Sequence, residues 1–574
     1  MKPSKRTFAP GAQPAATRLT YAEAIDRGAV LLGAGKLAEA EQICRTILQA
    51  KPDDFNAVLL LGIVRSHRNQ LDAALACFEQ ALSSQPASYD ALFNRALTLQ
   101  RLQRQEEALQ SYERVLAIKP DCIESLNNRG NALQQLGRPI EAIASYDRAL
   151  ALAPQYADAL NNRGNTLKKL RRYGEALECF DRALAAQPAH PQLLNHRAVV
   201  LHAVRRYGDA LADYDRAVSI NPAYVEALSN RGVTLHALQR YAEALKSYDD
   251  ALAIEPSYAD AVWNKSLLLL ALGELFEGWL LYEWRTRRSD APAARSFSKP
   301  LWEGEDVRGK RLLLHAEQGL GDAIQFSRYA TIAAARGATV ILEVPQALNA
   351  LVSGIDGVSV VVSTGNALPE YDLHCPLMRM PLVLGTTLAT IPAATPYINV
   401  DAQTLARWSA KLGPRTRMRV GLVWTGNPLH HNDSNRSIPF DLLAPLLDLP
   451  VDWICLHKDL SAEERDALTK RPAVRYFAND IADFADTATL TQLCDMVISV
   501  DTAVAHLAGA LGKPLWLLLP SFPDWRWLVE RDDSPWYPSA RLFRQPALGD
   551  WASVIEHVKR QMQALLGNVP AAAN

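Results

Sequence analysis

Small and aromatic apolar positions recur between Tyr21 and Pro256 with a fixed period of 34 residues. An alanine, a second small residue, an aromatic residue and a proline each return once per period. The prolines are Pro52, Pro86, Pro120, Pro154, Pro188, Pro222 and Pro256, and the aromatics are Phe78, Tyr112, Tyr146, Phe180, Tyr214 and Tyr248. This pattern predicts a stack of helix pairs, in which each proline turns the chain out of the second helix.

The small positions allow the two helices of one unit to approach closely, and the aromatic residue is expected to fill the gap to the next unit. These residues resemble the tetratricopeptide repeat over 21–292, as seven full repeats and a divergent eighth unit. The eighth unit begins at Ala259 and places Tyr282 at the aromatic position. We expect it to cap the array and to pack on the domain that follows.

A second pattern begins after the array, where short apolar runs alternate with helical stretches. Thr339–Val344, Met496–Val500 and Leu515–Leu519 are three of the runs that read as strands. Alternating strands and helices predict parallel sheets, whose ligands bind at the carboxyl ends of the strands. The predicted fold class is therefore an α superhelix of tetratricopeptide units, followed by an α/β part built from two Rossmann-like halves with a cleft between them.

Changes in composition along the chain suggest six segments. The expected segments are a disordered leader (1–20), the array (21–292), a linker (293–307), a first Rossmann-like half (308–400), a second linker (401–416) and a second half (417–574). Residues 322–336 are predicted to form one helix. The final helix, over 551–566, is expected to cross back to the first half.

The stretch 499–514 reads as the end of a strand, a tight turn and a short helix. Asp501 and Thr502 are cap residues, and Ala503 begins the helix. His506 follows Thr502 by four residues, so both side chains can lie on the face nearest the turn. Free N–H groups and the positive end of a helix dipole favour a phosphate at such a turn. The alternative is an ordinary buried strand–helix unit with a hydrogen-bonded histidine.

A glycine loop with the sequence EQGLGD runs from Glu317 to Asp322, directly after a predicted strand. Gly319 and Gly321 permit a tight turn close to a ligand. The loop lacks the dinucleotide fingerprint, because Ile324 stands where its third glycine belongs. Asp322 is either a helix cap or the base that takes a proton from an acceptor hydroxyl, and Glu317 is the alternative base.

A polar loop over 424–439 follows the first strand of the second half. Thr425 and Asn427 offer hydrogen bonds, and Arg436 offers a fixed fork of donors for a phosphate. His430 and His431 are adjacent in the sequence, so we interpret them as loop residues rather than as a metal site.

Aromatic side chains flank an arginine at Trp525, Arg526 and Trp527. Such a segment can stack on a base or a sugar while Arg526 holds an anion. The alternative is that both tryptophans are packing residues.

Together these motifs resemble the lipopolysaccharide heptosyltransferase family over about 308–545. The resemblance implies the GT-B fold, which consists of two Rossmann-like halves. The family's first glycine loop ends in an aspartate thought to act as base, which corresponds to Asp322. Its loop entering the second half carries a threonine and a basic residue, which correspond to Thr425 and Arg436.

The family's D-[ST]-G-x-x-H turn corresponds to Asp501, Thr502 and His506. Ala503 stands here where the family has glycine, which alters the closest approach of the backbone to the donor. The resemblance implies an inverting, metal-independent transferase, in which Thr502 and Arg436 stabilise the leaving phosphate. Residues 301–574 contain no DxD motif. We therefore expect a nucleotide-activated sugar as donor substrate, with no metal and no other cofactor.

An amide side chain recurs at one position of the first helix in most repeat units, which gives a ladder of amides along the array. Its members are Asn94, Asn128, Asn162, Asn230 and Asn264, with His196 in the sixth unit. In tetratricopeptide units this position faces the concave groove, where amides can bind the backbone of an extended peptide. The O-linked N-acetylglucosamine transferases carry a similar ladder before their catalytic half. The alternative is that a tolerated asparagine spread by duplication of the unit.

Composition narrows the class of protein without changing this interpretation. The formal net charge is −1, which gives no indication of nucleic-acid binding. The seven cysteines are scattered and include no CxxC pair, as expected of reduced thiols in a cytoplasmic protein. No apolar run reaches the length of a membrane span, and the N-terminus lacks a signal peptide's apolar region.

The hypothesis with the most support is a glycosyltransferase that modifies a hydroxyl of a protein held by the array. Repeat arrays joined to a sugar-transferase half also occur in bacterial flagellin-modifying enzymes, which suggests flagellin or another surface protein as acceptor. One alternative is a saccharide or lipid transferase whose repeats serve assembly. Another is a non-catalytic scaffold whose C-terminal part senses a nucleotide sugar.

Overall fold

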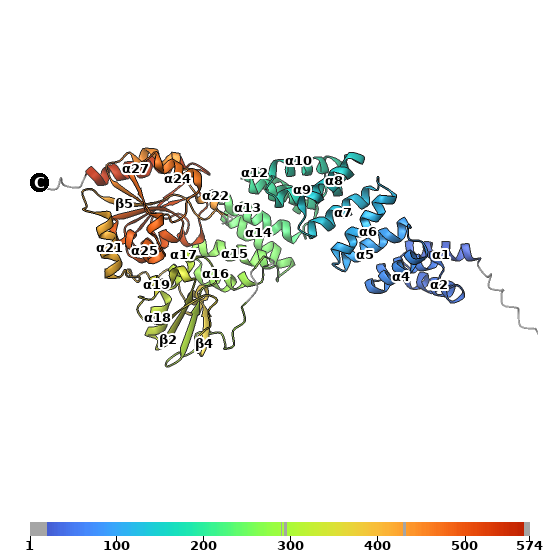
Figure 1. The fold of residues 1–574 in the computed structure, drawn as a ribbon, viewed down its shortest axis with the longest axis horizontal. Helices are drawn as coiled ribbons and strands as arrows, with labels where there is room; N and C mark the ends of the chain where they lie inside the picture. Colours follow the sequence, from blue (N-terminus) through green and yellow to red (C-terminus); the bar gives the residue numbers. More distant parts are fainter. Residues whose placement is uncertain (1–19, 289, 292–294, 429–431, 568–574) are drawn as a thin grey trace, which may run out of the picture. The chain divides into compact units, whose positions relative to one another are not determined.

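The computed structural model describes residues 20–288, 290, 291, 295–428 and 432–567. Nearly all of the predicted leader therefore lies outside the described residues. The chain forms two compact units, one within Met1–Asn230 and the other within Arg231–Asn574. Each unit is described by itself below (Figure 1).

The first unit is a stack of antiparallel helix pairs, as the 34-residue period predicts. Its helices are α1 (Tyr21–Gly33), α2 (Leu37–Ala50), α3 (Phe55–His67), α4 (Leu71–Ser84), α5 (Tyr89–Arg101), α6 (Gln105–Ile118), α7 (Ile123–Gln135), α8 (Pro139–Leu152), α9 (Ala157–Lys169), α10 (Tyr173–Ala186), α11 (Pro191–Ala203) and α12 (Tyr207–Ile220). Asp54 and Ser88 cap α3 and α5 through their side chains. Helix α13 (Val225–Ala237) continues the series across the boundary between the compact units.

In the repeats that carry glycine at the small position of the first helix, the aromatic residue of the second helix lies over that glycine. A Cβ atom added at Gly130 would come within 2.4 Å of the Tyr146 ring, and one added at Gly62 within 2.6 Å of Phe78. The contact is therefore within the unit, whereas the sequence predicts it toward the next unit. Small residues are needed at these positions because a side chain there would collide with a buried ring.

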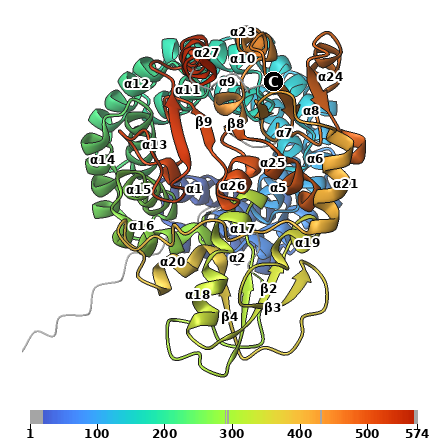
Figure 2. The ribbon, with the colours of Figure 1, turned by 90° about the vertical axis from the view of Figure 1, so that its left-hand side faces the viewer.

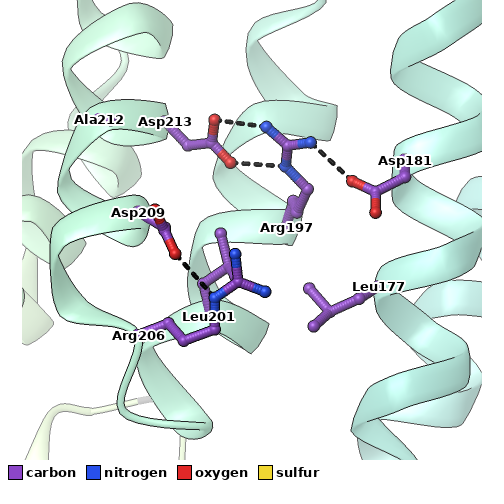
Figure 3. Close-up of a pocket in the computed structure, with 8 residues that line it drawn as sticks. All are labelled: Leu177, Asp181, Arg197, Leu201, Arg206, Asp209, Ala212 and Asp213. Carbon is purple, nitrogen blue, oxygen red and sulfur yellow. Dashed lines mark hydrogen bonds and ion pairs between the residues drawn. The ribbon is translucent and has the colours of Figure 1, made fainter.

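A basic side chain links consecutive units at the position after the amide ladder. Arg95, Arg129, Arg163 and Arg197 each bind the second helix of their own unit and that of the preceding unit. Arg197 donates to both carboxylate oxygens of Asp213 and to Asp181, each at 2.7 Å, beside a cavity of about 230 Å³ (Figure 3). This ladder of charges fixes the stacking of helix pairs, a role that the sequence analysis does not identify.

The second unit contains the last helices of the array together with two parallel sheets. The array helices are α14 (Tyr241–Ile254), α15 (Ala259–Leu272) and α16 (Leu275–Tyr282). On α16, the Trp279 ring centroid lies 5.1 Å from that of Trp525 and 6.0 Å from that of Phe326. The backbone N–H of Val529 donates to the carbonyl of Ala271 at 3.1 Å. The divergent eighth unit therefore packs on the α/β part, as expected.

The first sheet has four parallel strands in the order β3-β2-β1-β4. They are β1 (Arg311–His315), β2 (Thr339–Val344), β3 (Val358–Ser363) and β4 (Leu373–Pro376). Leu312 and Leu342 share a core with α17 (Leu320–Phe326) and α18 (Tyr329–Ala335). Leu313 and Ile341 point to the opposite face, where Phe297 of the predicted linker packs on them.

The second sheet has six parallel strands in the order β10-β9-β8-β5-β6-β7. They are β5 (Arg419–Val423), β6 (Asp452–Cys455), β7 (Val474–Tyr476), β8 (Met496–Val500), β9 (Leu515–Leu519) and β10 (Ala540–Arg544). This is the strand order of a Rossmann fold, and it reverses direction between β5 and β8. Helices α25 (Phe484–Leu493), α26 (Ala503–Ala510) and α27 (Trp551–Gly567) accompany this sheet. The predicted class, α followed by α/β with two Rossmann-like halves, is thus confirmed.

Three elements differ from the sequence prediction. The helix expected over 322–336 is interrupted between α17 and α18, where the Arg328 guanidinium turns inward to the carbonyls of Pro392 and Trp536. Residues 402–412 of the expected second linker form α21 (Ala402–Leu412), capped by Asp401. The final helix α27 does not cross to the first half, because its apolar face is buried against the second sheet.

A buried histidine makes the stability of the second unit depend on pH. His236 lies edge-on to Phe522 at 4.5 Å between ring centroids, and burial lowers its pKa to about 4. The histidine of the unfolded chain titrates near 6.5, so the unfolded state binds an extra proton between pH 4 and pH 6.5. The free energy of unfolding should therefore fall by about 2 kcal/mol between pH 7 and pH 5 on account of this group.

Denaturant unfolding at the two pH values measures this effect. The His236→Gln variant should lose that share of the pH dependence, while His557→Gln, at an exposed position on α27, should keep the dependence of the parent protein. Equal pH dependence in the His236→Gln variant and the parent protein would show that His236 is not the group responsible.

Candidate functional site

The three predicted motifs leave the carboxyl ends of β1, β5 and β8. The strand order reverses between β5 and β8 in the second sheet and between β1 and β4 in the first, and such points open a crevice for a ligand. Helix α17, which follows β1 of the first sheet, packs against α26, which follows β8 of the second sheet (Figure 2). This contact brings together the loops that precede the two helices. A Cβ atom at Gly321 would lie 2.8 Å from the His506 ring, so this close approach needs glycine.

Asp322 and Arg526 form a buried ion pair, although 204 positions separate them in the chain. The Arg526 guanidinium also donates to Asp524 Oδ1 and to Gln325 Oε1, both at 2.8 Å. The second carboxylate oxygen of Asp322 accepts the Gly319 N–H at 2.8 Å. Asp322 therefore caps the helix, one of its two predicted roles, and also belongs to a charged cluster.

Burial dominates the electrostatics of this cluster. It raises the pKa of the Asp322 carboxyl above its ordinary value, although Arg526 opposes that effect. Burial alone would lower the pKa of Arg526, but Asp524 and Asp322 together raise it. Arg526 therefore stays charged and holds two carboxylates in one place.

The turn after β8 places Asp501, Thr502 and His506 beside that cluster. Burial, followed by the charge of Asp524, raises the pKa of Asp501 to about 6. Burial also lowers the pKa of His506 well below its ordinary value, so the ring is neutral. Its Nδ1 lies 3.0 Å from the Tyr537 hydroxyl, and its Nε2 lies 3.9 Å from Asp501 Oδ1. These contacts hold the histidine ring in place at the turn after β8.

The start of α26 is not capped by its own side chain. Thr502 occupies the cap position without a side-chain hydrogen bond to the helix, and its hydroxyl lies 3.3 Å from Ser499 Oγ. Ala503 is the first residue of this helix. A turn whose N–H groups are not capped by a side chain suits an anionic ligand, and this is the geometry expected from the sequence.

Arg436 approaches the same turn from the loop after β5. Its Nη1 donates to the Asp501 carbonyl at 3.0 Å, and its Nε lies 3.2 Å from Asp433 Oδ1. A Cβ atom at Gly426 would lie 2.5 Å from the guanidinium, so the glycine makes room for the arginine. The hydroxyl of Thr425 donates to Ser437 Oγ at 3.2 Å. The structure thus joins Arg436 to the turn after β8.

Several predicted residues lie apart from this cluster or outside the description. Glu317 forms an ion pair at 2.8 Å with Arg285, which follows the last array helix. Asn427 belongs to the same loop as Arg436. His430 and His431 lie outside the described residues. Over the described part of the chain, no three His, Cys, Asp or Glu side chains come together as metal ligands.

The amide ladder is engaged within the array. Asn162 Nδ2 donates to Asn127 Oδ1 at 3.0 Å, and Asn230 Nδ2 donates to Asn195 Oδ1 at 3.1 Å. Asn94 donates to a backbone carbonyl of its own helix. At Asn162 and Asn230 the ladder therefore ties the first helices of successive units together. Asn128 lies on α7 of the first unit and Asn264 on α15 of the second.

Sequence analysis missed four residues of these arrangements. Gln325 and Asp524 hold Arg526, and Tyr537 holds His506. Asp524 directly precedes the segment Trp525–Trp527, and Tyr537 follows Trp536 in a second aromatic pair, but no sequence pattern marks Gln325. Asn127 had a detectable signal, because it forms part of the NN pair that recurs at 161–162.

Comparison with known proteins supports the repeats directly. The tetratricopeptide repeat family models match residues 59–121, 121–189, 161–225 and 225–258. The prediction of tetratricopeptide repeats is therefore confirmed for 59–258, a part of the chain that suits protein interaction. No helix in the described ranges is both long and apolar enough to cross a membrane.

A relative and two solved structures share parts of the chain. Protein FlbA of Caulobacter vibrioides is 28% identical over 333 residues, which is 50% of this chain and 52% of that protein. The chain thus spans about half the length of this curated relative. A tetratricopeptide repeat protein from Parabacteroides merdae is 21% identical with a TM-score of 0.37, covering 43% of this chain and 98% of that one. PilW, a type IV pilus biogenesis factor, is 28% identical with a TM-score of 0.34, covering 36% and 96%.

Proposed function

We propose that the chain is a glycosyltransferase that moves a sugar from a nucleotide-activated donor to a hydroxyl of a protein held by the repeat array. One observation carries the proposal. Contacts among the loops after β1, β5 and β8 bring Asp322, Arg436 and His506 together where the strand order reverses. Parallel sheets bind ligands in a crevice at such a point, and the cationic and carboxylate groups there suit a nucleotide diphosphate and an acceptor hydroxyl.

The groups at the crevice divide the chemistry between them. Arg436 and the N–H groups at the start of α26 would hold the donor phosphates and stabilise the leaving phosphate. Asp322 would take the proton of the acceptor hydroxyl while the hydroxyl oxygen attacks the anomeric carbon of the donor sugar. Arg526 would keep Asp322 ionised in its buried position. Glu317 is the weaker candidate for the base because Arg285 binds it.

Nucleotide binding tests the proposal. We expect calorimetric titration of the full chain with UDP, GDP, ADP and CMP to show binding of one of them. The Arg436→Gln variant should weaken that binding by about tenfold or more, because a charged hydrogen bond to phosphate is lost. Arg415→Gln is the matched control, since Arg415 lies in the same half but is 60% exposed and paired with Asp495.

Donor turnover separates the competing functions. Slow hydrolysis of one nucleotide sugar by the purified chain would support the transferase. Binding of a nucleotide without turnover, and without any change in cell protein on mass spectrometry when the chain is deleted, would favour the nucleotide-sensing scaffold. A change in glycan or lipid but not in protein would favour the saccharide or lipid transferase.

A further inference from the structure

The first helices of three successive repeats line a hollow of about 400 Å³. Eight polar side chains from α7, α9 and α11 line it, namely five amides, two lysines and one histidine. The lining includes no carboxylate and no large aromatic ring. Single-stranded nucleic acids use aromatic rings as stacking platforms, so this lining favours a peptide.

Neither lysine of the hollow forms an ion pair with a residue that the structure describes. Among the residues that the structure describes, no carboxylate lies within ion-pairing distance of Lys168 or Lys169. Glu226 acts on Lys168 electrostatically, but its carboxylate accepts from Asn195 at 3.0 Å. Burial lowers the pKa of Lys168, as expected of an ammonium group without a partner.

The amides around these lysines offer both hydrogen-bond donors and hydrogen-bond acceptors to the backbone of a peptide. The Tyr146 hydroxyl donates to Asn131 Oδ1 at 2.8 Å, which leaves the NH2 group of Asn131 as a donor. Asn162 uses its NH2 group on Asn127, which leaves its oxygen as an acceptor. An extended peptide presents alternating donors and acceptors and can use both.

We propose that this hollow binds an extended peptide segment with acidic side chains, which Lys168 and Lys169 recognise. The inference rests on the proposed function, in which the array holds the protein acceptor. The inference adds a preference for acidic peptides, because amides that bind only the peptide backbone do not distinguish one peptide sequence from another. The positive lining, whose lysines form no ion pair with a described residue, supplies that preference.

Fluorescence anisotropy on the full chain tests the inference with three labelled peptides, in which Ser alternates with Glu, with Gln or with Lys. The Glu peptide should bind roughly five- to tenfold more tightly than the Gln peptide at low salt, and the Lys peptide should bind least. The Lys168→Gln/Lys169→Gln double variant should reduce binding of the Glu peptide to the level of the Gln peptide. Lys246→Gln, at an exposed and ion-paired lysine of α14, should change nothing.

Equal binding of the Glu and Gln peptides, or a preference that survives in the double variant, would overturn the inference. Failure to bind any of the three peptides would overturn it as well. Donor turnover distinguishes this failure from failure of the proposed function, because the double variant leaves the crevice between the sheets intact. A chain that turns over a donor but shows no preference among peptides would keep the transferase and lose only the acidic acceptor.

Discussion

Replacing Asp322 by asparagine should reduce sugar transfer by about 10²- to 10⁴-fold, the usual contribution of a general base. The substitution keeps the size of the side chain and one oxygen, which can accept from either the Gly319 N–H or Arg526, while an NH2 group replaces the other oxygen. It removes the proton acceptor. Initial rates with the donor that the chain turns over, measured beside thermal unfolding, separate loss of catalysis from loss of folding.

Glu317→Gln is the matched control for this prediction. Glu317 lies in the same loop but pairs with Arg285, so its variant should keep the rate within tenfold of the parent. The parent should also show an acid limb in its pH–rate profile, displaced upward because burial raises the pKa of Asp322. A full rate in Asp322→Asn, together with a lost rate in Glu317→Gln, would transfer the role of base to Glu317.

Replacing Trp279 by alanine should destabilise the second compact unit by about 3–5 kcal/mol, the cost of removing a large buried aromatic ring. Trp279 is 1% exposed and packs on Tyr282, Phe326 and Trp525. Trp525 adjoins Arg526, so the lost packing should also loosen the partner of Asp322. Denaturant unfolding monitored by far-ultraviolet circular dichroism gives the change in free energy.

Trp279→Phe is the control for this substitution. It keeps most of the buried ring and removes an indole N–H that has no hydrogen-bond partner among the described residues. We expect it to lose much less stability than the alanine variant. If the alanine variant unfolds at the same denaturant concentration as the parent, α16 does not belong to the core of this unit.

The repeats and several strands were predictable because their signals are local. Period and side-chain size located the helix pairs, and Thr339–Val344 and Met496–Val500 form strands with the predicted bounds. Strands β4 and β10 were missed because β4 has four residues and ends in proline, and β10 carries arginine at both ends of its central run. The break in the helix near Arg328 depends on carbonyls distant in the chain.

The members of the candidate site were predictable, but their pairing was not. Asp322 and Arg526 each belong to a motif that marks them separately, whereas their ion pair joins α17 to the segment after β9, 204 positions along the chain. The amide ladder shows the same limit. Its period is visible in the sequence, but the bond from Asn162 to Asn127 appears only when the first helices of two units lie side by side.

The burial of Trp279 also decides where the chain can be divided. A shortened protein that began at the sequence boundary near 308 would expose Phe326 and Trp525 to water, since α16 covers them. We expect such a fragment to aggregate, and one that begins before α13, whose His236 packs on Phe522, to remain in solution. We expect that repeats upstream of α13 can be removed or added in steps of 34 residues without changing the contacts among Asp322, Arg436 and His506. The length of the groove and the chemistry at the crevice can thus be altered independently.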